Sequence, residues 1–121
     1  MAEKHLETEI LDYLATIKGV FAFKINTTGI YDPKRKVFRK NSNPHCHNGT
    51  ADILGTCNGV FFAIEVKWGR NKASDNQKIF LKRVESAGGK AIVVNSFDSF
   101  YGWFKTNFPE VKMPTCHLLF N

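Results

Sequence analysis

The segment from Val60 to Trp68 constrains the fold of this chain more than any other part of its sequence. It reads Val-Phe-Phe-Ala-Ile-Glu-Val-Lys-Trp, which is rich in β-branched and aromatic residues, and it follows Asn58-Gly59, a dipeptide that favours a hairpin turn. The segment Ala51–Thr56 on the other side of this turn also reads as a short strand. The two segments therefore predict a β-hairpin in which the numbers of opposite residues sum to about 117.

This register brings two carboxylates together. Asp52 lies opposite Glu65, and Lys67 shares the face of Glu65 because side chains alternate along a strand. Phe61 and Ala63 make that face partly apolar, which argues against a solvated surface pair of Glu65 and Lys67. Adjacent carboxylates repel each other unless a cation lies between them, and oxygen ligands suit Mg²⁺ or Mn²⁺. The pattern predicts a metal site suited to phosphodiester hydrolysis, with Lys67 offsetting phosphate charge or steering the attacking water.

Helical and extended patterns alternate along the rest of the chain. We expect helices over residues 3–18, 75–87 and 98–107, strands over 20–26 and 90–95, a short hairpin within 29–39 and an edge strand within 116–120. The strands over 60–68 and 90–95 are joined through a helix and should run parallel, whereas the earlier strands should pair antiparallel. The expected fold is α/β, with a mixed central sheet flanked by helices, in one domain over residues 1–121.

Composition narrows the class of partner and the compartment. The 17 Lys and Arg residues exceed the 11 Asp and Glu residues, and a net charge of +6 favours polyanions such as nucleic acid or anionic lipid. No apolar run approaches the roughly 20 residues that span a bilayer, and no signal-peptide core follows the polar start. Cys46, Cys57 and Cys116 form no disulfide framework, and His45-Cys46-His47 matches no common zinc spacing. We expect a cytoplasmic protein without a membrane partner.

The motifs together resemble a known nuclease superfamily. Gly49-Thr50-Ala51-Asp52 followed by Glu65-Val66-Lys67 resembles the PD-(D/E)xK signature. The wider pattern, with Ser74-x-x-Gln77 and then Gly88 before Ala-Ile-Val-Val, resembles the VRR-NUC branch over residues 3–99. That branch includes small stand-alone phage nucleases and the nuclease domain of the Fanconi-associated nuclease. Ala51 stands where the family usually has Pro, which removes a backbone constraint but no ligand.

The resemblance implies a restriction-endonuclease-like core and a Mg²⁺- or Mn²⁺-dependent endonuclease that acts on DNA. It implies that Asp52, Glu65 and the Val66 carbonyl bind the metal and that Lys67 is catalytic. The alternative function is a non-catalytic nucleic-acid-binding module on the same fold.

A glutamate on the first helix usually completes the metal site in the family. Glu3, Glu7 and Glu9 are the candidates, and we choose Glu7 because it borders the apolar stripe of the helix. A solvated glutamate on the helix face is the alternative. For Gln77, the resemblance implies a position facing the active site, whereas Ser74-Asp75-Asn76-Gln77 also reads as a capping box. Both interpretations of Gln77 stay open.

Basic residues flank these motifs and are expected to contact phosphates, with a solvated loop as the alternative. They are Lys34, Arg35, Lys36, Arg39, Lys40, Arg70 and Lys72.

The small chain has no separate recognition domain, which favours branched or four-way junction DNA over a long specific sequence. A homodimer would supply two active sites, as in the Holliday-junction resolvases that stand-alone family members resemble. The aromatic residues of 97–108 and the first helix are candidate dimer surfaces, or else plain core. If the chain is phage-encoded, the cytoplasm is that of the host.

Overall fold

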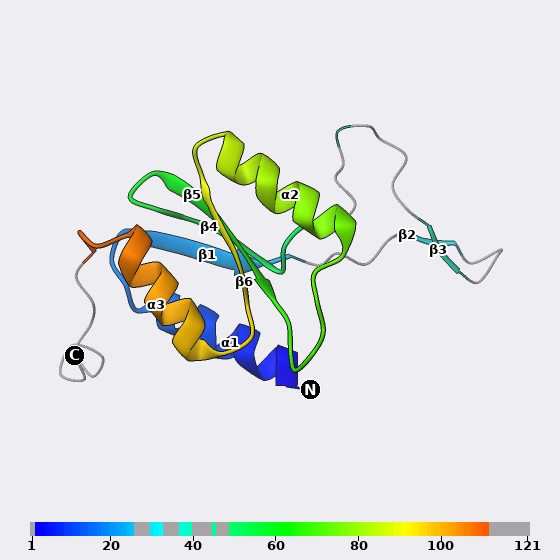
Figure 1. Ribbon diagram of the computed structural model, residues 1–121, viewed down its shortest axis with the longest axis horizontal. Helices are drawn as coiled ribbons and strands as arrows, with labels where there is room; N and C mark the ends of the chain where they lie inside the picture. The colour runs from blue at the N-terminus through cyan, green and yellow to red at the C-terminus, as the bar shows by residue number, and fades with distance from the viewer. Residues whose placement is uncertain (1, 26–29, 33–36, 40–44, 46–48, 112–121) are drawn as a thin grey trace.

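A four-stranded mixed sheet organises the part of the chain that the computed structural model describes, which is residues 2–25, 30–32, 37–39, 45 and 49–111 (Figure 1). Its strands lie in the order β1 (Val20–Lys24), β4 (Ile53–Cys57), β5 (Val60–Val66), β6 (Lys90–Val94). Helices α1 (Ala2–Ala15) and α3 (Phe97–Asn107) cover one face, and α2 (Asp75–Ser86) covers the other. Strands β2 (Ile30–Asp32) and β3 (Val37–Arg39) form a separate antiparallel pair, so the hairpin predicted within 29–39 is confirmed.

The central hairpin adopts the predicted register. Cys57 lies opposite Val60 across the turn, and the ladder runs on to Ile53 opposite Ile64. Asn58 and Gly59 have φ values of 50° and 86°, both in the left-handed region that the favoured two-residue hairpin turn requires. β6 runs parallel to β5, and β1 runs antiparallel to β4, as the connections predict. The α/β class with a mixed sheet flanked by helices is therefore confirmed.

The first helix is shorter than the periodicity predicts. The sequence predicts a helix to residue 18, but α1 ends at Ala15. The backbone N–H and the hydroxyl of Thr16 both donate to the Tyr13 carbonyl, at 3.0 and 2.6 Å, which tightens the last turn. Ile17 stays buried, which explains why the apolar spacing continued past the helix. Gly19 has a φ of 91° and turns the chain into β1.

Strand β5 is buried on both faces. Phe62, Ile64 and Val66 pack into the larger core beneath α1 and α3. On the opposite face, Ala63 packs into a smaller core with Leu81 and other residues of α2. The face that carries Glu65 is thus covered by a helix, and the interpretation of Glu65 and Lys67 as a solvated surface pair is wrong.

The aromatic residues of 97–108 belong to the core of a single chain. Phe100, Phe104 and Phe108 are almost fully buried, and Phe97, Tyr101 and Trp103 pack against them. The apolar residues of α1 are buried in the same cluster. The buried members of these segments are core, as one interpretation predicts, and a dimer surface formed by their partly exposed residues stays a prediction.

Two predictions concern segments without a description. The edge strand expected within 116–120 lies outside the described residues, and so do Cys46 and Cys116.

In the described segments, no helix combines the length and the apolar character needed to cross a bilayer.

Replacing Phe104 by Ala should destabilise the fold strongly, because its ring lies within 5.0 to 6.4 Å of the rings of Phe62, Phe100 and Phe108. We expect the free energy of unfolding to fall by about 3–5 kcal/mol in a urea titration. Ile79→Ala is the control, since this side chain is 50% exposed, and it should change stability much less. Equal losses in the two variants would contradict this assignment of the core.

Candidate metal centre

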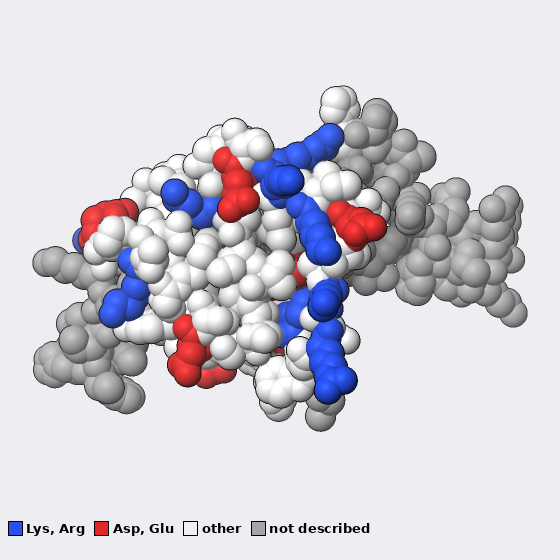
Figure 2. Space-filling view, in the orientation of Figure 1, with Lys and Arg blue, Asp and Glu red and all other residues white. Residues whose placement is uncertain are grey.

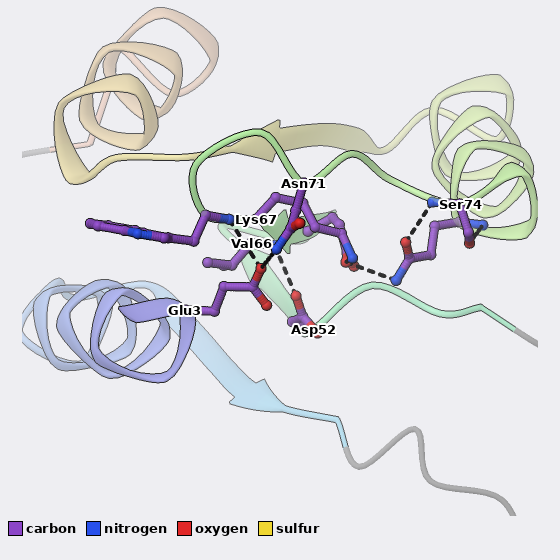
Figure 3. A network of polar contacts seen from close by, with 9 residues as sticks. Glu3, Asp52, Val66, Lys67, Asn71 and Ser74 are labelled. Carbon is purple, nitrogen blue, oxygen red and sulfur yellow. Dashed lines mark hydrogen bonds and ion pairs between the residues drawn. The ribbon is translucent and has the colours of Figure 1, made fainter. Parts of the chain in front are cut away.

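Asp52 lies at the entrance to β4, one residue before the strand begins. One carboxylate oxygen, Oδ2, accepts a hydrogen bond of 2.9 Å from the backbone N–H of Val66, at the end of β5 (Figure 3). Asp52 and Glu65 each lie one residue beyond Ile53 and Ile64, the last pair of the ladder, and they are close enough for the charge of Asp52 to act on Glu65. The structure therefore brings Asp52 and Glu65 together, as the hairpin register predicts.

Glu65 is a carboxylate inside the protein, with 1% of its side chain exposed. Its Oε2 atom accepts a hydrogen bond of 2.8 Å from Nε2 of Gln77 and lies 3.1 Å from Nζ of Lys67. Its Oε1 atom is buried and receives no hydrogen bond from an N–H or hydroxyl group of the described residues, while the carboxyl group of Asp52 lies close enough to share a proton with Glu65. Leaving a buried acceptor without a partner is costly, so this oxygen is available for a further ligand.

Burial raises the pKa values of both carboxyl groups. Burial and, next, the negative charge of Asp52 raise the pKa of Glu65 from 4.5 to about 7. Burial also raises the pKa of Asp52, although the hydrogen bond from Val66 opposes that rise. Lys67 lowers both pKa values but does not cancel the effect of burial. Burial thus disfavours the negative charge of both groups more than Lys67 favours it.

A hard divalent cation fits this arrangement. Asp52 and Glu65 supply the carboxylate oxygens that Mg²⁺ and Mn²⁺ prefer, and no donor group in the described part of the chain binds Oε1 of Glu65. No cluster of three or more His, Cys, Asp or Glu side chains suited to a metal occurs in the described segments. Mg²⁺ sites commonly have only one or two carboxylates, with water and substrate phosphate as the other ligands, so two are sufficient. The backbone of Val66 lies at the same place, because its N–H binds Asp52.

Glu7, the predicted third carboxylate, lies at the border of this site. Its side chain is only 10% exposed, which excludes a fully solvated position, and it pairs with Lys24 of β1 at 3.0 Å. Its negative charge contributes to the raised pKa of Asp52. Glu7 therefore affects Asp52 electrostatically, but Glu7, Asp52 and Glu65 do not form a preassembled three-carboxylate site.

Glu3 has a role that the sequence did not reveal. Its Oε2 atom accepts hydrogen bonds from the backbone N–H of Trp68, at 3.0 Å, and from Nδ2 of Asn71, at 3.1 Å (Figure 3). These contacts fasten the loop after β5 to the start of α1. Trp68 follows Lys67 directly, so Glu3 fixes the backbone next to the candidate catalytic lysine. The family resemblance made Glu3 only one of three possible ligands, and the sequence did not reveal its contacts because its partners lie more than 60 residues away.

Gln77 satisfies both interpretations that the sequence left open. Its Oε1 atom accepts from the backbone N–H of Ser74 at 2.8 Å, and its own N–H donates to Oγ of Ser74 at 3.2 Å, which completes the capping box. The remaining amide group, Nε2, donates to Glu65. One side chain therefore both caps α2 and orients the buried carboxylate.

The structure describes only some of the basic residues that are predicted to contact phosphates. Arg70 and Lys72 are exposed in the loop between β5 and α2. Figure 2 shows Lys and Arg side chains gathered in a column that runs from α2 down towards this loop. Lys34, Arg35, Lys36 and Lys40 lie outside the described residues, and the side chain of Arg39, at the end of β3, does as well.

Comparison with known proteins leaves the site to be judged on its own geometry. Neither the models of known protein families nor the curated proteins give a match to this chain. The support for a function therefore comes from the buried carboxylates, their partners and the motifs that carry them.

The raised pKa of Glu65 predicts a pH-dependent stability in the absence of metal. Because the folded protein binds this proton more tightly than the unfolded chain, the contribution of Glu65 is largest below pH 4.5 and is lost as the pH rises to about 7. With EDTA present, wild type should lose on the order of 3 kcal/mol relative to Glu65→Gln over this interval. Urea titrations of both proteins between pH 4.5 and 8 measure the difference. A difference that does not change with pH would show that Glu65 titrates normally.

Proposed function

We propose that this chain is a metal-dependent DNA endonuclease that hydrolyses phosphodiester bonds with Mg²⁺ or Mn²⁺ bound at Asp52 and Glu65. The observation that carries the proposal is the buried Glu65 carboxylate, which lies beside Asp52 and whose Oε1 atom meets no donor group among the residues that the structure describes. The proposal includes a restriction-endonuclease-like core and membership of the VRR-NUC branch. The Gly-x-x-Asp and Glu-x-Lys motifs support it, because they stand at the adjoining ends of β4 and β5.

Asp52, Glu65 and the Val66 carbonyl would hold the ion. When bound, the ion would activate water and polarise a phosphoryl oxygen. Gln77 occupies Oε2 of Glu65, which orients the carboxylate and leaves Oε1 for the metal. The N–H of Val66 holds Asp52 in the same way through Oδ2. These second contacts keep the ligands in place before the metal arrives.

Lys67 is the residue that links the ion to the substrate. Its side chain is 20% exposed, while its ammonium group lies 3.1 Å from Glu65. It therefore reaches from the buried carboxylate to the surface, where a phosphate would bind. There the ammonium would stabilise the negative charge that grows on the phosphoryl oxygens or orient the attacking water. Glu3 anchors the adjoining Trp68 and so limits the freedom of this backbone.

The proposal extends to branched DNA, to a homodimer and to a cytoplasmic location. One metal centre cuts one strand, and two-fold symmetry supplies a second centre at a fixed distance. Phe100 and Phe104 of α3 are buried in the core, so we place the dimer contact on a more exposed aromatic surface. Phe21 and Phe23 are exposed on β1, the edge strand of the described sheet, and a second copy would pack there. The buried free thiol of Cys57 agrees with a reducing compartment.

Lys67→Ala should abolish cleavage while DNA binding is retained. It removes one charge aimed at the reacting phosphate, for which a loss of about 10²–10³ in rate is expected. The assay uses linear duplex, flap and four-way junction DNA with Mg²⁺ or Mn²⁺, and binding is measured with EDTA. Lys18→Ala, an exposed lysine at the start of β1, is the control and should cut as wild type does.

Three outcomes of this assay would contradict parts of the proposal. Cleavage by Lys67→Ala within a few-fold of wild type would remove Lys67 from the mechanism. A wild-type protein that binds DNA but never cuts it with either metal would favour the non-catalytic module. A strict monomer by light scattering that cuts duplex and junction equally would refute the dimer and the preference for branched DNA.

A further inference from the structure

A hollow lies beside Lys67, and its lining residue Val93 is the strand partner of Glu65. It has a volume of about 360 Å³ and lies at the carboxyl ends of β5 and β6, between the loop after β5 and the first turns of α2 and α3. Ligands of open α/β sheets commonly bind at the carboxyl ends of strands. The volume falls near the lower end of the roughly 300–1,000 Å³ typical of small-molecule pockets.

The charge of this pocket selects an anion. Lys67, Lys72 and Lys78 line it, and no Asp or Glu does so. Lys67 is partly neutralised by Glu65, whereas Lys72 and Lys78 form no ion pair with another described residue. Both are exposed, so their ammonium groups can meet a ligand from solvent. They come from the segment of the chain over which the basic column of Figure 2 runs.

The remaining lining is too varied for a phosphate alone. Val93 is 40% exposed on β6 and provides an apolar wall. Asn71 and Asn95 provide amide groups, each with a donor and an acceptor, and Asn71 is held in place by its hydrogen bond to Glu3. A nucleotide presents matching features, because its phosphate is anionic and its base has an apolar ring face and hydrogen-bonding edges.

We propose that this pocket binds one unpaired nucleotide of the strand that is cut, next to the scissile phosphate. Lys72 and Lys78 bind its phosphate, and its sugar and base lie against Val93 and Asn95. Lys67 lines the pocket and also contacts Glu65. The bound nucleotide and the phosphate at the metal centre therefore belong to the same strand of the DNA. A pocket for one nucleotide, rather than for a base pair, makes an unpaired residue part of the substrate. The position of the nucleotide next to a scissile phosphate rests on the proposed nuclease function, whereas nucleotide binding itself does not.

The test is an NMR titration of the ¹⁵N-labelled full chain with thymidine 5′-monophosphate in EDTA. We expect saturable shifts of the Asn71 and Asn95 signals, and binding about tenfold weaker in Lys72→Ala/Lys78→Ala. Lys18→Ala/Lys90→Ala loses the same charge at the opposite end of the sheet and should bind as wild type does. The same spectra show whether each variant is folded.

The outcomes separate this inference from the nuclease proposal. Equal weakening in both double variants, or shifts confined to other regions, would overturn the pocket. Inorganic phosphate binding as tightly as the nucleotide would overturn the assignment of sugar and base. Nucleotide binding at the pocket without DNA cleavage would leave the pocket standing and remove the nuclease function. Cleavage of DNA without nucleotide binding at the pocket would overturn the pocket and support the nuclease function.

Discussion

The burial of Glu65 beside Asp52 determines how the surrounding elements must be arranged. β5 is covered on both faces, so a carboxylate at its end loses water and needs partners from other segments. Such a group is stable only if it is hydrogen-bonded, protonated or paired with positive charge. Gln77 and Lys67 meet part of that need through Oε2, and the raised pKa shows that the need is not fully met. A divalent ion would complete the charge balance.

Several contacts around this pair serve two purposes. Gln77 caps α2 and orients Glu65, so the position of the helix and the position of the carboxylate depend on the same amide. Glu3 joins the first turn of α1 to the loop that carries Asn71, next to both the proposed metal centre and the lysine-lined pocket. The ends of β4, β5 and β6, the loop after β5 and three helices thus meet in one region. A change in one of these contacts is expected to affect stability and function together.

The sequence predicted most of the local structure and the centre of the site, because both depend on short-range patterns. Asn58-Gly59 determined the hairpin register, and the register placed Asp52 beside Glu65. Long-range contacts were not predictable in the same way. The pairing of Glu7 with Lys24 and the anchoring of Trp68 by Glu3 depend on how α1 packs against the sheet, which periodicity does not specify. The apolar periodicity also predicted too long a first helix, because Ile17 is buried although it follows the end of α1.

The central claim is that Asp52 and Glu65 bind one divalent ion, and anomalous diffraction from crystals soaked in Mn²⁺ tests it most directly. The geometry predicts a single strong peak between the two carboxylates, within reach of Oε1 of Glu65, that disappears in Asp52→Asn crystals. Coordination distances near 2.0–2.2 Å, about those of the similar Mg²⁺ ion, would identify the ligands. The absence of a peak there, or a peak only at another place such as His45 and Cys46, would contradict the assignment of the metal centre.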